Sequence, residues 1–128
     1  MEELLRRIVD ERVKKPSALR TVRFECSHII SMAEAFCAKE VDQWTWDAIR
    51  KLNTLRNDIA HKLEPRGMKD RVDHLVSVVR KNSVFAEGGF GTGDRAVQFE
   101  YCLWVLFANL TALLKRPSAR LLKLIPRK

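Results

Sequence analysis

The sequence is poor in the residues that interrupt helices and in those that build disulfide or zinc frameworks. Its 128 residues include only 5 Gly, 4 Pro and 3 Cys. Cys26, Cys37 and Cys102 are an odd, scattered set without a Cys-x-x-Cys pair, so we expect small buried thiols rather than a disulfide frame or a metal site. A run of about 18 apolar residues and a signal peptide are also missing. We therefore expect a cytoplasmic protein without stable membrane insertion.

Strand-forming patterns are equally scarce, because no long alternation of apolar and polar residues occurs. The hydrophobic content of 46%, with 3 Trp and 6 Phe, is sufficient for a core. We predict an all-α fold, a single-domain helical bundle of about five helices that spans residues 1–128. The expected helices cover residues 2–14, 17–39, 42–63, 68–81 and 94–116.

Apolar periodicity is clearest in the second expected helix. It follows Lys14-Lys15-Pro16, and Ser17 is its candidate N-cap. Apolar residues then recur at heptad spacing, which is typical of a continuous buried face. This face would comprise Leu19, Val22, Cys26, Ile29, Ala33 and Phe36, with Glu40 as its one polar member.

The last expected helix is apolar nearly all round between Tyr101 and Leu114. Such a helix is either central in its bundle or shared with another subunit, and a chain of this size has little room for a central helix. We therefore predict a homodimer. A glycine-rich loop at residues 86–93 precedes the helix and lacks the Gly-Lys-Ser/Thr of a P-loop. A basic tail at residues 115–128 follows it and is suited to contact phosphates, to form an amphipathic segment or to dock on the body.

The charge balance favours a polyanionic partner. The chain has 24 Lys and Arg against 16 Asp and Glu, a formal net charge of +8. RNA, DNA and an acidic membrane face all fit this charge, although many basic proteins bind none of them specifically.

The most informative stretch is Arg56-Asn57-Asp58-Ile59-Ala60-His61, within the third expected helix. At about 100° per residue, one apolar arc of this helix contains Ile49, Leu52, Leu55, Ile59, Ala60 and Leu63. Arg56 falls within the same arc, where a buried guanidinium would need a partner or a route to solvent. Asn53, Asn57 and His61 line one edge of the polar side at four-residue spacing, with Arg50 beside them.

This stretch resembles the signature of the HEPN superfamily, in which an arginine and a polar residue precede a histidine by a few positions. The resemblance implies a small all-α bundle, a dimer and, for many members, a metal-independent RNase of toxin–antitoxin or phage-defence systems. It also implies a non-catalytic alternative, because regulators similar to the mannitol-operon repressor carry a related Arg-Asn…Ala-His string. An antitoxin or another protein partner is compatible with either branch.

RNA cleavage without a metal needs a base for the 2′-hydroxyl proton and a cation for the phosphate oxygens. We predict His61 as the base, since a neutral imidazole accepts a proton near pH 7. Arg56 would hold the phosphate through its planar fork, and Asn57 would orient the ring or the phosphate. The catalytic residues expected are therefore Arg56, Asn57 and His61, with no metal and no cofactor. The RNA-binding residues expected are Arg50, Asn53 and Lys62.

Three observations qualify this interpretation: the helix geometry, a structural alternative for Arg56, and the absence of a tyrosine that one toxin subfamily carries. Positions five apart on a helix differ by roughly 140°, so Arg56 and His61 of one copy do not share a face. Arginine is long enough to swing partly round, or a two-fold dimer could make a composite cleft from two copies. Arg56 would also suit a buried ion pair with Glu34 or Glu100. The nucleotidyltransferase-paired toxins of the superfamily place a tyrosine two residues after the histidine, where this chain has Leu63. The contrasting function is a non-enzymatic regulatory or protein-interaction module.

The remaining histidines, His28 and His74, have no partners at metal-ligand spacing. Asp70, Asp73 and His74 are interpreted as a solvated helix face. Trp44 and Trp46 are expected to pack the start of the motif helix rather than to stack on bases.

Overall fold

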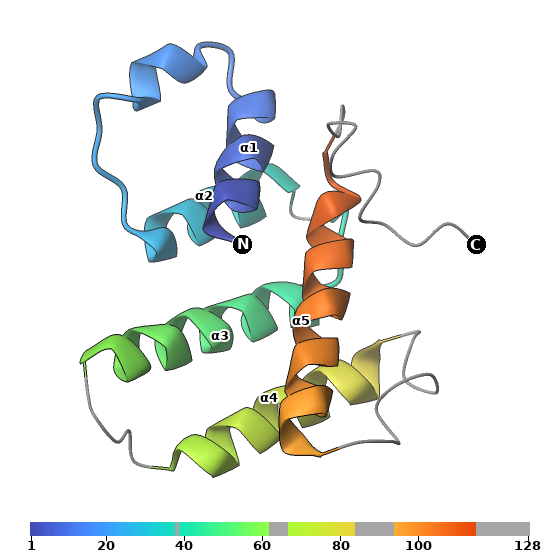
Figure 1. Cartoon of the computed structure of the whole chain (residues 1–128). Coiled ribbons are helices and arrows are strands. Elements are labelled where there is room, and N and C mark those ends of the chain that lie inside the picture. The colour runs from blue at the N-terminus through green and yellow to red at the C-terminus, as the bar shows by residue number, and fades with distance from the viewer. Residues whose placement is uncertain (38, 62–66, 84–93, 115–128) are drawn as a thin grey trace. The chain divides into compact units, whose positions relative to one another are not determined.

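The chain forms helices joined by irregular segments, as the computed structural model shows (Figure 1). The structure describes residues 1–37, 39–61, 67–83 and 94–114. Within these ranges there are five α-helices, one short 3₁₀ helix and no strand, so the predicted all-α class is confirmed. The glycine-rich loop, the basic tail and Lys62 lie outside the described residues.

The chain divides into two compact units. The first comprises Met1–Val41 and Phe107–Lys128. Helices α1 (Glu2–Arg12) and α2 (Cys26–Cys37) pack against each other in it, and the 3₁₀ helix η1 (Pro16–Leu19) lies between them in sequence. The second unit, Asp42–Leu106, contains α3 (Gln43–His61) packed on α4 (Met68–Asn82). Helix α5 (Arg95–Thr111) contributes its N-terminal part to the second unit and its last turn, from Phe107, to the first.

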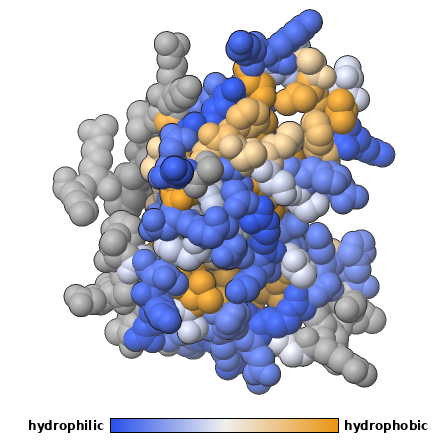
Figure 2. Space-filling model, turned by 180° about the vertical axis from the view of Figure 1, so that it is seen from behind, coloured by the Kyte–Doolittle hydropathy of each residue, from blue (hydrophilic) through white to orange (hydrophobic). Residues whose placement is uncertain are grey.

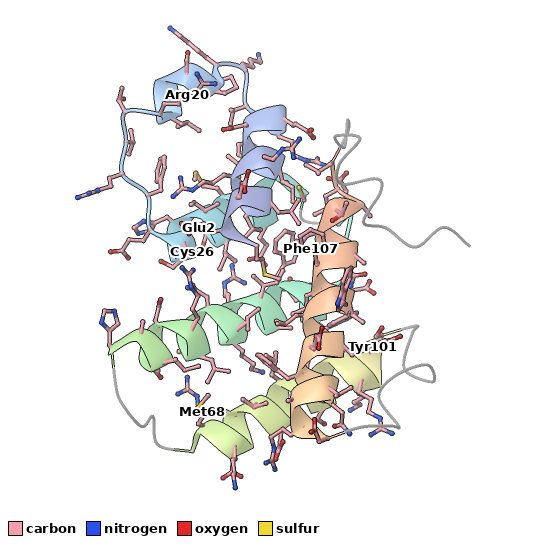
Figure 3. All side chains as sticks on the ribbon, in the orientation of Figure 1. Glu2, Arg20, Cys26, Met68, Tyr101 and Phe107 are labelled. Atoms are coloured by element: carbon pink, nitrogen blue, oxygen red, sulfur yellow. The ribbon has the colours of Figure 1, made fainter. Side chains whose placement is uncertain are left out.

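The prediction of a continuous helix over residues 17–39 is wrong. Only η1 is helical before Cys26, which is labelled at the start of α2 in Figure 3. The amide of Glu25 donates a hydrogen bond to His28 Nδ1 at 3.2 Å, so the imidazole caps a backbone N–H at the helix N-terminus. The two β-branched residues Thr21 and Val22 also disfavour helix in the preceding segment.

The buried face of α2 differs from the heptad prediction as well. Val22 is 49% exposed and Phe36 is 45% exposed. The buried residues are instead Ile29, Ile30, Ala33 and Cys37. The predicted heptad began in a segment that is not part of α2. Its first positions, Leu19 and Val22, therefore could not indicate which face of α2 is buried.

The other helix boundaries agree with the predictions more closely. Asp94 caps α5, since its Oδ1 accepts a hydrogen bond from the amide of Val97 at 3.0 Å. Gly67 precedes α4 with φ of 65°, a conformation that residues with a Cβ rarely adopt. Helix α5 ends at Thr111, earlier than the predicted residue 116.

Two of the cysteines are buried and one is half-buried. Cys37 and Cys102 are almost inaccessible, whereas Cys26 is of intermediate exposure. Burial raises the pKa of the Cys102 thiol to about 12, because desolvation disfavours the thiolate. Since the thiolate is the reactive form, Cys102 is chemically inert at neutral pH.

Some large apolar side chains remain at the surface. Figure 2 shows apolar residues exposed among hydrophilic ones on one face of the molecule. The exposed large apolar residues of the described ranges are Val22, Phe36, Ile59, Met68, Val97 and Trp104. No helix in these ranges is both long and apolar enough to cross a bilayer.

Arg12 holds three segments of the first unit together. Its Nη1 and Nη2 donate to the Glu40 carboxylate at 2.6 and 3.2 Å, and Nη2 also donates to the Leu113 carbonyl at 2.9 Å. The Leu113 carbonyl lies just beyond the end of α5, where carbonyls lack intrahelical partners. Only 12% of the Arg12 side chain is exposed.

We expect Arg12→Met to lower the free energy of unfolding by about 2–3 kcal/mol, because a largely buried carbonyl and a carboxylate lose charged hydrogen bonds. Urea unfolding followed by circular dichroism measures the change. Glu40→Gln is the control and should cost less, since 49% of that side chain is exposed. Equal stability of Arg12→Met and the wild type would show that these hydrogen bonds contribute nothing net.

Candidate functional site

Helix α3 carries every predicted site residue that the structure describes, and its two ends differ in burial. Its buried residues are Thr45, Trp46, Ala48, Ile49 and Leu55. Beyond Leu55 the helix is open to solvent: Ile59 is 47% exposed, and Arg56, Asn57, Ala60 and His61 are all exposed.

The predicted apolar arc is therefore wrong for the last turns of the helix. Ile59 and Ala60 do not enter a core, and Arg56 is not buried among apolar side chains. Periodicity identifies the face on which apolar residues gather, but it does not determine how far along the helix a neighbouring element covers that face.

The three predicted catalytic residues are accessible to a substrate. Arg56 and Asn57 occupy adjacent positions, and His61 is the last residue of α3. Asn57 and His61 are four positions apart and share a helix face, whereas Arg56 lies roughly 140° around the axis from His61. One copy of α3 therefore presents the imidazole and the guanidinium in different directions.

Two of the predicted RNA-binding residues are less exposed. Arg50 is half-buried. Asn53 is half-buried too, and its Oδ1 is buried without a hydrogen-bond partner in the part of the chain that the structure describes. This oxygen is therefore directed away from solvent.

A groove lies between α3 and α4, which run antiparallel in Figure 1. Its volume is about 450 Å³. Helix α3 lines it with Arg50, Lys51, Thr54 and Leu55, and α4 lines it with Asp70, Arg71, His74 and Leu75. Figure 3 shows side chains of both helices between the two ribbons, with Met68 labelled at the start of α4.

Two polar contacts join the helices at this groove. Arg71 Nη1 donates to Asp58 Oδ2 at 2.6 Å, with 34% and 28% of the two side chains exposed. Lys51 Nζ lies 3.2 Å from His74 Nε2. An ammonium group can only donate hydrogen bonds, so Lys51 is the donor in this contact.

The sequence prediction did not identify Lys51, Arg71 or His74 as site residues. His74 is exposed, as a solvated face requires, yet it also lines the groove and contacts Lys51 across it. Arg71 and His74 at i, i+3 on α4 were the available clue, because such residues share a helix face. Their alignment with Lys51 depends on the register of one helix against the other.

Asp73 belongs to a separate ion pair. Arg95 Nε and Nη2 donate to its carboxylate at 2.7 and 3.1 Å. The hydrogen bond from Arg95 lowers the pKa of Asp73, and the carboxylate in turn raises the pKa of Arg95. Asp73 therefore joins α4 to the start of α5 and is not part of the groove.

Among residues 1–37, 39–61, 67–83 and 94–114, no group of three or more His, Cys, Asp or Glu side chains is placed to hold a metal ion. Comparisons of the chain with protein-family models, with curated proteins and with solved structures found no match.

Proposed function

We propose that the protein is a HEPN-type, metal-independent endoribonuclease of a toxin or phage-defence system. The observation that carries the proposal is the exposure of Arg56, Asn57 and His61 together on the last turns of α3. The structural alternative required Arg56 to form a buried ion pair, and an exposed side chain does not support that role. The formal net charge of +8 favours a polyanionic substrate.

In the proposed reaction, the neutral imidazole of His61 accepts the proton of a ribose 2′-hydroxyl. The 2′-oxygen attacks the adjacent phosphorus, and the bond from phosphorus to the 5′-oxygen breaks. The 5′-oxygen leaves with a proton from water or from an imidazolium. The products are a 2′,3′-cyclic phosphate and a 5′-hydroxyl. Arg56 stabilises the charge that develops on the non-bridging oxygens, and Asn57 orients the ring or the phosphate.

We infer that a second copy of the chain completes this site. Since Arg56 and His61 of one α3 point roughly 140° apart, the guanidinium of one copy would meet the imidazole of the other across a two-fold axis. The homodimer is thus part of the proposal. A protein antitoxin that covers the exposed end of α3 would inhibit such an enzyme.

We expect the purified protein to cleave single-stranded RNA in the presence of EDTA and to leave a 2′,3′-cyclic phosphate at the new end. The same strand with 2′-O-methyl or 2′-deoxy ribose should resist, because the attacking hydroxyl is missing. Gel separation of end-labelled strands and mass spectrometry of the products measure both results. Cleavage of the 2′-O-methyl strand, or products with a 3′-hydroxyl end, would contradict the mechanism.

The second candidate function is a non-catalytic regulatory or protein-interaction module. Ile59, 47% exposed among Arg56, Asn57 and His61, favours it, since an apolar side chain amid polar ones suits a protein contact. A pure wild-type protein that cleaves no RNA, with or without divalent metals, would favour this function over the enzyme.

A further inference from the structure

The groove between α3 and α4 combines an apolar floor with a basic rim. Leu55 and Leu75 are 3% and 1% exposed and form buried apolar surface at its base. The charged lining groups are Arg50, Lys51, Arg71 and Asp70, and Arg71 is paired with the Asp58 carboxylate. The groove volume, about 450 Å³, is within the range of sites that take small organic ligands.

Lys51 is the basic group best placed to bind an anion there. Its ammonium carries three donors, and one of them points to His74 Nε2 at 3.2 Å. Because an imidazole ring carries no negative charge, the contact orients the ammonium without neutralising its charge. By contrast, Arg71 is already paired with the Asp58 carboxylate at 2.6 Å.

Two neighbours of Lys51 on α3 also line the groove. Arg50 precedes Lys51 and lines the same groove, and its guanidinium can bind phosphate oxygens in a bidentate manner. The hydroxyl of Thr54, which also lines the groove, donates to the Arg50 carbonyl at 3.1 Å.

We propose that the α3–α4 groove is a nucleotide subsite for an RNA strand. Lys51 and Arg50 would bind a backbone phosphate, and the base would lie against the mainly apolar lining of the groove. His74 would act as a positioning residue for Lys51. The inference deepens the proposed function by naming a substrate subsite, and it rests on that function for the choice of RNA as the strand.

An acidic protein segment is the competing ligand, since it would also be drawn to the cations. The structure favours a nucleotide because the lining of the groove is mainly apolar, which suits the face of a planar base better than a run of carboxylates.

Binding is tested with the wild-type protein and a fluorescein-labelled 2′-O-methyl RNA octamer, which has no 2′-hydroxyl to react. We expect Lys51→Gln to weaken binding roughly three- to tenfold at fixed salt, and the double change Arg50→Gln with Lys51→Gln to weaken it further. Lys81→Gln, an exposed lysine in the last turn of α4, removes the same charge outside the groove and should change affinity little. Equal losses for Lys51→Gln and Lys81→Gln would overturn the subsite, because only net charge would then matter.

Two further measurements separate the alternatives. In protein labelled with ¹³C-histidine, adenosine 5′-monophosphate should shift the imidazole resonance of His74 and leave that of His28 unchanged. No shift of His74 at millimolar nucleotide would overturn the proposal. In the second measurement, unlabelled RNA and a hexaglutamate peptide compete with the octamer. Equal displacement by the two competitors would also overturn the proposal.

The binding measurements test the subsite independently of catalysis. A protein that binds the octamer through Lys51 yet cleaves no RNA would retain the subsite and refute the enzyme. A protein that cleaves RNA with unchanged affinity after Lys51→Gln would retain the enzyme and refute the subsite.

Discussion

His61→Ala is expected to reduce RNA cleavage by roughly 10²–10⁴-fold, the contribution of a positioned general base. The imidazole is exposed at the end of α3, so its removal takes nothing from the core and leaves no buried group without a partner. The free energy of unfolding should therefore change by less than about 0.5 kcal/mol. Initial rates on end-labelled RNA and urea unfolding of the same preparation measure the two effects.

His28→Ala is the control for cleavage, because His28 is also an exposed helical histidine but lies on α2 in the other unit, where it accepts a hydrogen bond from the Glu25 amide. It should retain wild-type cleavage. Arg56→Ala should likewise reduce cleavage without a large loss of stability, since Arg56 is exposed and surface substitutions usually change stability little. Full activity of His61→Ala would remove His61 from the mechanism, whatever the control shows.

Trp46→Ala is expected to lower the free energy of unfolding by about 3–5 kcal/mol, the cost of removing a large aromatic side chain from a core. Trp46 is 0% exposed and is among the largest fully buried side chains of the described residues. Near the start of α3 it anchors the helix that presents Arg56, Asn57 and His61. Thermal or urea unfolding monitored at 222 nm measures the loss.

The exposed Trp104 provides the comparison for Trp46. Trp104→Ala removes the same side chain at a position that is 47% exposed, and it should cost much less stability in the monomer. Trp46→Phe should fall between the two. It leaves a smaller cavity, and it removes an indole N–H that is buried without a partner in the described part of the chain. Similar losses for the two alanine variants would mean that burial of Trp46 does not determine the stability of this helix.

Local features of the sequence predicted most of the helices. Asp94 marks the start of α5 because its carboxylate accepts the Val97 amide, an interaction between residues three apart. Gly67 marks the start of α4 through its positive φ. The 3.6-residue period was sufficient to recognise α3. The break before α2 was missed because the heptad continued through Leu19 and Val22, and apolar spacing alone does not show that a segment is helical.

What the sequence by itself determined is the helical class, the basic charge and the position of Arg56, Asn57 and His61 on one helix, since these follow from composition and from residues close in the chain. The tertiary structure decided which residues are covered: it buries Trp46 and Leu55 and leaves Arg56 and Ile59 in solvent. It also brought Lys51 to within 3.2 Å of His74, and no local rule specifies that contact. The reason is physical, because caps and periodicity act within a few residues, whereas burial and cross-helix distances depend on where another helix packs.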